Sequence, residues 1–169
     1  MVEDNKFYPG MLHLKREEYE LARDFFQSLT DQEPNNAEAH AWLAAAYGRL
    51  LENGSLLEKV MLLPDFEKEV ATALELDAEL TLARKVNGLR LLHTPKEFGG
   101  DPEEAAKELE YAIANGEKDS EAYYGLGLAY LATELKEKAE AAFIEALQYN
   151  PNHAEARQQL EFIHKGATL

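Results

Sequence analysis

The sequence predicts an all-α protein made of four successive helical hairpins and a closing helix. The chain has 169 residues, of which 46% are hydrophobic, so it is long and apolar enough to bury one continuous core. Small and aromatic residues recur every three to four positions, which places them on one face of a helix. The same arrangement of residues also returns several times along the chain, which indicates a repeat architecture.

The clearest hairpin spans residues 120–151. Residues at helical spacing mark its two halves: Tyr123, Leu126, Gly127 and Tyr130, then Ala139, Phe143 and Ala146. Gly127 has no side chain, so the second helix can approach the first closely at that position. Pro151 ends the unit, because proline cannot continue a helix.

This order resembles the tetratricopeptide repeat, whose pattern of about 34 residues runs W-x2-L-G-x2-Y, then A-x3-F, then P. Tyr123 stands in place of the tryptophan. Counting back from Gly127 finds equivalent small residues at Gly88, Ala44 and Gly10, at intervals of 39, 44 and 34 residues. The residues in excess of the 34-residue repeat lie between the first and second helices of the second repeat and of the third repeat. The resemblance implies an α-solenoid forming a single domain over residues 1–169, with repeats at about 3–36, 37–80, 81–119 and 120–151.

The first two repeats depart from the pattern. Pro9 occupies an apolar helix position, so the first helix is either kinked or begins there. In the second repeat, the insertion predicts a turn at Asn53-Gly54-Ser55 and a short helix over Leu56 to Leu63. Pro64 then suits the first position of a new helix.

The third repeat and the end of the chain also carry boundary signals. Pro95 ends a helix, while Asp101 and Pro102 read as the N-cap and first residue of the next one. Residues 152–165 place Ala154, Leu160 and Ile163 at helical spacing. They predict a capping helix that covers the last hairpin.

The side-chain chemistry favours a non-enzymatic protein with no catalytic, metal or cofactor site. The sequence has no cysteine, which excludes disulfides and thiolate sites. None of the five histidines has another histidine three or four residues away, as a helical metal site requires. Gly125 and Gly127 lie inside a predicted helix and follow no strand, so they do not form a dinucleotide loop. Carboxylates are too abundant for any pair of them to indicate catalysis.

The net charge of −15 excludes nucleic acid and anionic membrane surfaces as partners and favours basic or apolar segments of proteins. No segment approaches the roughly 20 apolar residues of a membrane span. Met1 to Gly10 lack the pattern of a signal peptide, so a cytoplasmic location is the default expectation. An exported protein that has lost its leader remains an alternative.

The resemblance implies that the first helices of the repeats line a concave groove that binds a protein or peptide. The expected groove residues are Phe7, Met11, Leu14, Ala41, Ala45, Arg49, Leu82, Lys85, Leu89, Leu92, His93, Glu121, Tyr124, Leu128 and Leu131. Of these, Leu89, Tyr124 and Leu128 are expected to form one anchor pocket that lies outside the packing between repeats. The alternative is that these apolar groups pack against the insertions or the capping helix.

Chaperone-binding members of this family clamp a terminal carboxylate with basic residues and asparagine. The matching positions here are Phe7, Met11, Trp42, Leu82 and Val86, so peptides with acidic chaperone tails are not expected to bind. Two other functions stay open. One is a structural homo-oligomer. The other is a bacterial envelope or transporter-associated repeat protein, which the short loop from Pro95 to Asp101 resembles.

Overall fold

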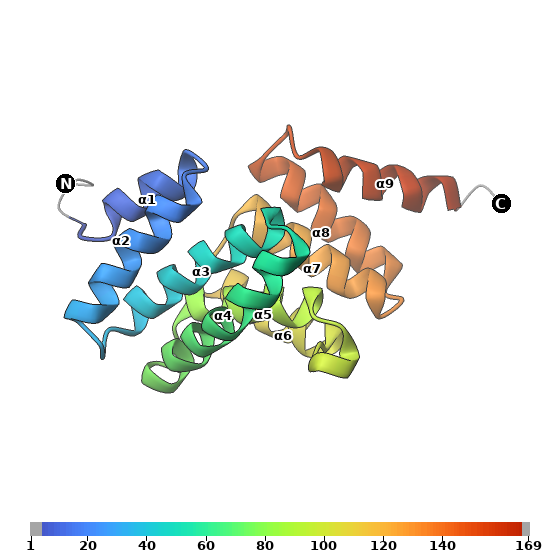
Figure 1. The fold of residues 1–169 in the computed structure, drawn as a ribbon. Helices are drawn as coiled ribbons and strands as arrows, with labels where there is room; N and C mark the ends of the chain where they lie inside the picture. The colour runs from blue at the N-terminus through green and yellow to red at the C-terminus, as the bar shows by residue number, and fades with distance from the viewer. Residues whose placement is uncertain (1–4, 167–169) are drawn as a thin grey trace. The chain divides into compact units, whose positions relative to one another are not determined.

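The computed structural model describes residues 5–166, and this part of the chain contains nine α-helices, one short 3-10 helix and no strand (Figure 1). The expected start of the first repeat at residue 3 lies outside the described residues. The helices are α1 (Tyr8–Lys15), α2 (Tyr19–Gln32), α3 (Ala37–Asn53), α4 (Leu56–Leu76), α5 (Thr81–His93), η1 (Lys96–Phe98), α6 (Pro102–Ala114), α7 (Ser120–Ala132), α8 (Lys136–Tyr149) and α9 (Ala154–Gly166). The predicted all-α fold of helical hairpins with a closing helix is confirmed.

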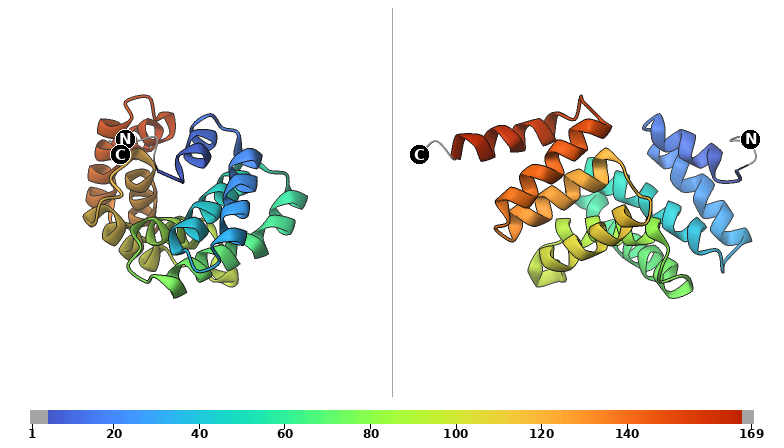
Figure 2. Two further views of the ribbon diagram at one scale, coloured as in Figure 1. Left: turned by 90° about the vertical axis from the view of Figure 1, so that its left-hand side faces the viewer. Right: turned by 180° about the vertical axis from the view of Figure 1, so that it is seen from behind.

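The helices form two compact units, one ending at Val86 and the other beginning at Asn87, so that the boundary falls within α5. Helices that follow one another in the chain pack side by side within each unit (Figure 2). In the first unit α1 packs on α2, and α3 packs on both α2 and α4. In the second unit α7 packs on α6 and α8, and α9 packs on α8. The single-domain organisation stays a prediction.

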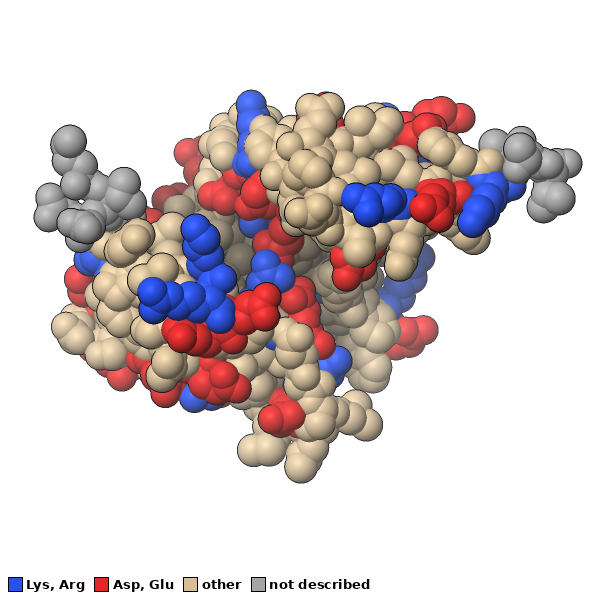
Figure 3. Space-filling model, turned by 90° about the horizontal axis from the view of Figure 1, so that it is seen from above, with Lys and Arg blue, Asp and Glu red and all other residues tan. Residues whose placement is uncertain are grey.

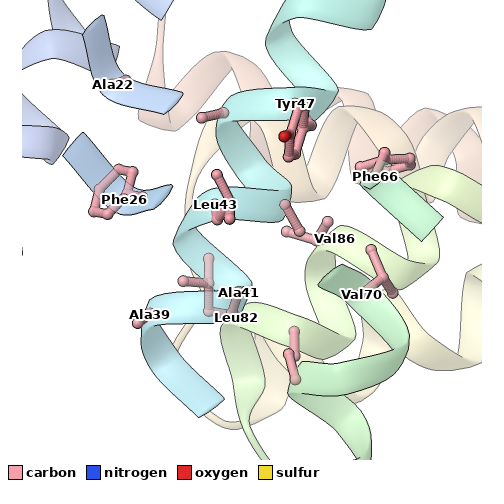
Figure 4. Close-up of a cluster of buried hydrophobic side chains, with 14 of the residues drawn as sticks. Ala22, Phe26, Ala39, Ala41, Leu43, Tyr47, Phe66, Val70, Leu82 and Val86 are labelled. Atoms are coloured by element: carbon pink, nitrogen blue, oxygen red, sulfur yellow. The ribbon is translucent and has the colours of Figure 1, made fainter. Parts of the chain in front are cut away.

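The core of the first unit lies between α2, α3, α4 and the first half of α5 (Figure 4). Phe26 of α2 and Leu43 of α3 are fully buried. The Phe26 ring stacks on Trp42, with ring centroids 5.8 Å apart. Gly10 of α1 lies directly over Phe26, because a methyl group at Gly10 would lie 2.4 Å from the Phe26 ring. The small residue of the first repeat therefore serves close helix approach, as the repeat pattern predicts.

The core of the second unit also contains two glycines that lie where helices pack closely. A methyl group at Gly127 of α7 would lie 2.5 Å from the ring of Phe143 in α8, and Phe143 is fully buried. A methyl group at Gly88 would lie 2.7 Å from Leu109 of α6. The repeat pattern thus identified correctly where the helices of the last two hairpins cross.

The insertion of the second repeat lengthens helices instead of adding one. α3 has 17 residues and α4 has 21, and Pro64 lies inside α4. The prediction of a short helix followed by a new helix at Pro64 is therefore wrong. Pro64 is exposed, while Leu62 and Phe66 on either side of it pack into the core. This packing keeps α4 continuous although the proline removes one backbone hydrogen bond.

The other predicted boundaries agree with the structure. α1 begins at Tyr8 with Pro9 in its first turn, which is the second of the two alternatives for the first repeat. Asp101 caps α6 by accepting hydrogen bonds from the backbone N–H groups of Glu103 and Glu104 at 3.0 and 3.1 Å. In α9, however, Ala154 is exposed and Ala156 is the fully buried residue.

Candidate protein-binding surface

Four side chains share one side of α7: Glu121, Tyr124, Leu128 and Leu131, here named the α7 face. All four are partly exposed. The other sides of the helix are occupied by residues that pack inside the second unit, and Ala122 and Ala129 among them are fully buried. The α7 face is therefore a partly exposed side of this helix, and its members Tyr124, Leu128 and Leu131 also pack against the apolar cluster of the second unit. A role of these positions in binding stays a prediction.

Tyr124 is held at one end of this face by two other rings. Its ring centroid lies 5.8 Å from that of Phe143 in α8 and 4.6 Å from that of His153, just before α9. Burial raises the pKa of the Tyr124 hydroxyl, and the negative charge of Glu155 raises it further. The hydroxyl therefore stays protonated at neutral pH and can donate a hydrogen bond to a partner.

Ser120, His153 and Glu155 come together at the same end of α7. Ser120 Oγ lies 2.7 Å from His153 Nδ1, and His153 Nε2 lies 3.6 Å from Glu155 Oε2. Ser120 Oγ also donates a hydrogen bond to the carbonyl of Ala146 in α8, at 2.8 Å. The Ser120 hydroxyl thus bridges the Ala146 carbonyl and the His153 ring. The group is a clamp that joins α7, α8 and the start of α9.

Sequence reasoning missed this clamp because its members are far apart in the chain. Ser120 and His153 are separated by 33 residues. Ser120 begins α7 and His153 directly precedes α9, and neither position indicates that the two side chains are neighbours. Only the fold of the last hairpin and the capping helix brings them together.

The second half of α5 contributes Leu89, Leu92 and His93. Leu89 and Leu92 are partly buried in the apolar cluster of the second unit, which also includes Tyr124 and Leu128, while His93 is exposed. A methyl group at Gly125 would lie 2.7 Å from Leu89 Cδ2. The expectation that Leu89 lies outside the packing between repeats is therefore wrong, because the leucine fills the space above this glycine. The anchor pocket itself stays a prediction.

The expected groove residues of the first unit divide into two sets. Met11, Leu14, Ala45 and Arg49 are partly exposed, and Arg49 forms an ion pair with Glu52 at 3.0 Å. Four others are buried: Phe7, Ala41, Leu82 and Lys85. Ala41 has no exposed surface. These four offer a partner little to contact, because their side chains are part of the packed interior.

A hollow of about 620 Å³ lies in the first unit, between the turn that precedes α3 and the end of α4. Its lining includes Glu33, Asn36, Asp77 and Leu80, and none of the expected groove residues. Hydrogen bonds from Lys6 and Asn36 lower the pKa of Glu33. The carboxylate is thus already engaged with groups of its own chain.

The charged surface does not resemble that of a nucleic-acid-binding protein. On the face drawn in Figure 3, acidic side chains lie among basic ones instead of giving way to a basic tract. Within residues 5–166, no group of three or more histidine, aspartate or glutamate side chains is placed to hold a metal ion. None of the helices in this range is long and apolar enough to cross a membrane.

Comparisons with known proteins agree with this architecture. Residues 98–154, which include α6, α7 and α8, match the family model of the tetratricopeptide repeat. No curated protein matches the sequence. Residues 98–154 therefore match the tetratricopeptide repeat, and the described residues have the helical fold of tetratricopeptide-repeat proteins, as the sequence predicts.

Three solved structures illustrate the likeness. TTC0263, a tetratricopeptide-repeat protein of Thermus thermophilus, is 17% identical with a TM-score of 0.67, over 96% of this chain and 84% of that one. PilF of Pseudomonas aeruginosa is 21% identical with a TM-score of 0.69, over 99% and 69%. MamA of Desulfovibrio magneticus RS-1 is 23% identical with a TM-score of 0.61, over 97% and 86%. At these identities the likeness shows the fold.

Proposed function

We propose that this protein is a non-catalytic scaffold that holds an apolar or basic segment of a partner protein against the α7 face. One observation carries the proposal. Glu121, Tyr124, Leu128 and Leu131 share one side of α7 and stay partly exposed, although the three apolar side chains also pack against the cluster of the second unit, so part of their surface is left for a partner. An amphipathic helix of the partner would contact such a line with side chains three to four residues apart.

Charge supports a partner segment with basic flanks. The chain carries a net charge of −15, and Glu121 belongs to the α7 face itself. Long-range attraction speeds the approach of a basic segment, while contact with Tyr124, Leu128 and Leu131 supplies most of the affinity. Because salt screens the attraction, binding should weaken at high ionic strength without being abolished.

Designed peptides test the chemistry of the partner. We expect a labelled amphipathic helical peptide with leucines on one face and lysines on the other to bind, as measured by fluorescence anisotropy. A matched peptide with glutamates in place of the lysines should bind much more weakly. A peptide that ends in an acidic chaperone tail should not bind, because the apolar α7 face cannot repay the desolvation of a terminal carboxylate. Equal binding of all three peptides would contradict the proposed charge preference.

A substitution on the α7 face tests where the lysine-rich peptide binds. Leu128→Glu should weaken binding by about 2 kcal/mol, the cost of losing an interface hot spot. Ile144→Glu on α8 is the control, because Ile144 is an aliphatic residue of the same unit on another helix, with 44% of its surface exposed. Loss of binding in both variants, or in neither, would contradict the assignment to α7. Thermal melts of both variants establish that they are folded.

A further inference from the structure

The first half of α4 carries a ridge of apolar side chains that face solvent. Its members are Leu56, Leu57, Val60, Met61 and Leu63, with exposed fractions of 81%, 69%, 64%, 67% and 38%. At 100° per residue they cover one side of the helix, while Leu62 and Phe66 on the opposite side pack into the core of the first unit. This α4 ridge arises from the lengthened helix of the second repeat, and the α7 face does not include it.

The ridge is large for the surface of a monomer. Its five side chains together expose on the order of 600 Å², at the upper end of the apolar patches that monomeric proteins show. Two such ridges packed together would bury about 1,200 Å², which reaches the lower end of specific protein interfaces. The area is therefore sufficient for a reversible dimer.

The charges beside the ridge do not select a strongly basic or acidic partner. Glu58 and Lys59 have opposite signs. The Glu58 carboxylate is engaged in a capping box, where it accepts hydrogen bonds from the backbone N–H and the hydroxyl of Ser55 at 2.7 and 2.6 Å. These hydrogen bonds lower the pKa of Glu58, so its charge is held at the helix N-terminus. A surface that is neutral and apolar suits an equally neutral and apolar surface.

We infer that the α4 ridge is a self-association surface, on which a second copy of this chain packs its own α4 ridge about a two-fold axis. An antiparallel pairing centred near Val60 brings the Leu56 end of one ridge against the Leu63 end of the other. Two-fold contacts of this kind are the commonest in homo-oligomers, because one patch serves both partners. A membrane surface fits less well, since membrane-surface helices carry basic polar faces, and α4 uses its other side for packing.

Sedimentation velocity over a range of protein concentrations tests the inference. The wild-type chain should form dimers with a dissociation constant in the micromolar range, as an interface near the small end of the specific class allows. Met61→Glu should raise this constant by about 30-fold or more, as loss of a hot spot does. The control is Phe162→Glu, because Phe162 of α9 is 72% exposed and lies on another surface. Equal effects of both substitutions, or a wild-type chain that stays monomeric up to about 1 mM, would overturn the inference.

Oxidative cross-linking gives a second readout that requires no charged substitution. The chain has no cysteine, so Val60→Cys introduces a single thiol near the proposed two-fold axis. It should form a disulfide-linked dimer rapidly, because a disulfide requires the two Cβ atoms to approach within about 4 Å. Phe162→Cys should cross-link slowly. Similar rates for the two variants would contradict pairing through α4.

The salt dependence of self-association and a vesicle-binding assay distinguish a second copy of the chain from other partners of the α4 ridge. Self-association should strengthen as salt is added, because two chains of net charge −15 repel each other. Weakening by salt would overturn the inference, since it points to attraction between opposite charges. Vesicles of neutral or anionic phospholipid should not bind the wild-type chain on flotation. Flotation that Met61→Glu abolishes and Phe162→Glu preserves would assign the ridge to a membrane instead.

Discussion

At the scale of single residues, the buried polar contact between His40 and Glu69 joins α3 to α4. His40 Nδ1 lies 2.5 Å from Glu69 Oε2, and Nε2 lies 2.9 Å from the carbonyl oxygen of Pro34. The ring thus bridges the Glu69 carboxyl group of α4 and the backbone carbonyl of Pro34. Glu69 has 4% of its surface exposed, and His40 is its buried partner. Its other oxygen, Oε1, lies 3.6 Å from Nζ of the exposed Lys68.

Removing the histidine alone should be costly. His40→Leu leaves the buried Glu69 carboxylate with only the exposed Lys68 beside it, and we expect the free energy of unfolding to fall by about 3 kcal/mol. The double variant His40→Leu/Glu69→Leu should lose less, because it removes the buried charge together with its partner. Urea unfolding measures the free energy of unfolding of the single and the double variant. A single variant as stable as the wild type, or a double variant that is less stable than the single one, would show that the pair does not act in this way.

The sequence could not have identified this pair. Its members are separated by 29 residues. Glutamate is so common in the chain that a solvated helix face was the natural interpretation of Glu69. Burial of Glu69 follows from its position on α4 between Phe66 and Val70, two residues that pack against α3. Such a contact becomes visible only when the register between the two helices is known.

At the scale of elements, the glycines at the helix crossings differ from glycines elsewhere in the helices. Gly127 faces the ring of Phe143 at a distance that leaves no room for a side chain, whereas a methyl group at Gly48 would lie 3.7 Å from the nearest atom, Phe66 Cε2. Gly127 therefore sets how closely α7 and α8 approach. Gly48 lies in α3 without that role.

Alanine substitutions at these two glycines should change stability in opposite directions. Gly127→Ala overpacks the α7–α8 crossing and should destabilise the chain by about 1–3 kcal/mol. Gly48→Ala should stabilise it by up to about 1 kcal/mol, because alanine favours a helix and no atom needs to move. Thermal melts compare the two. Stabilisation by both substitutions would mean that the crossing is looser than the structure indicates.

The capping helix α9 should contribute to stability through a small apolar face. Ala156 is fully buried, and Leu160 and Ile163 pack against the cluster of the second unit. Ending the chain at Asn150 also removes His153 from Ser120 and Tyr124. At about 25 cal/mol per Å² of newly exposed apolar surface, the loss should reach several kcal/mol. A shortened chain that melts at the same temperature as the full chain would refute a capping role.

The repeat pattern predicted the hairpins well because small residues at helix crossings and prolines at helix ends are local signals. It failed at Pro64 for a physical reason. A proline is equally compatible with the first turn of a helix and with an exposed position in a long helix whose neighbours are well packed. The sequence between Leu56 and Leu63 predicted a helix correctly, but could not show that this helix continues to Leu76.

At the scale of the whole molecule, we expect the two compact units to unfold together as one domain. Val86 belongs to the buried cluster of the first unit and Leu91 to that of the second, and both are residues of the continuous helix α5. Melting either cluster therefore removes support from a helix that the other uses. Calorimetry should give one transition whose calorimetric and van't Hoff enthalpies agree. Two separate transitions would show that the units are independent domains.

The chain presents two apolar surfaces with different proposed occupants, the α7 face for a partner segment and the α4 ridge for a second copy. The sequence pattern predicts the first as part of a groove, because its four residues follow the helical period of a repeat, and its role in binding stays a prediction. It predicted a helix for the second but not its exposure, since the exposure of Leu57 or Met61 depends on how α4 packs. The structure is therefore needed to recognise the α4 ridge as a second apolar surface beside the α7 face.

Methyl NMR of the leucine and methionine residues, recorded as the lysine-rich amphipathic peptide is added, tests the central claim most directly. The proposed function predicts that the largest changes occur at Leu128 and Leu131 of the α7 face. The resonances of Leu56, Leu57 and Met61 on the α4 ridge should stay unchanged at constant protein concentration. Changes confined to the α4 ridge, or no changes at Leu128 and Leu131 under conditions where anisotropy shows binding, would contradict the account.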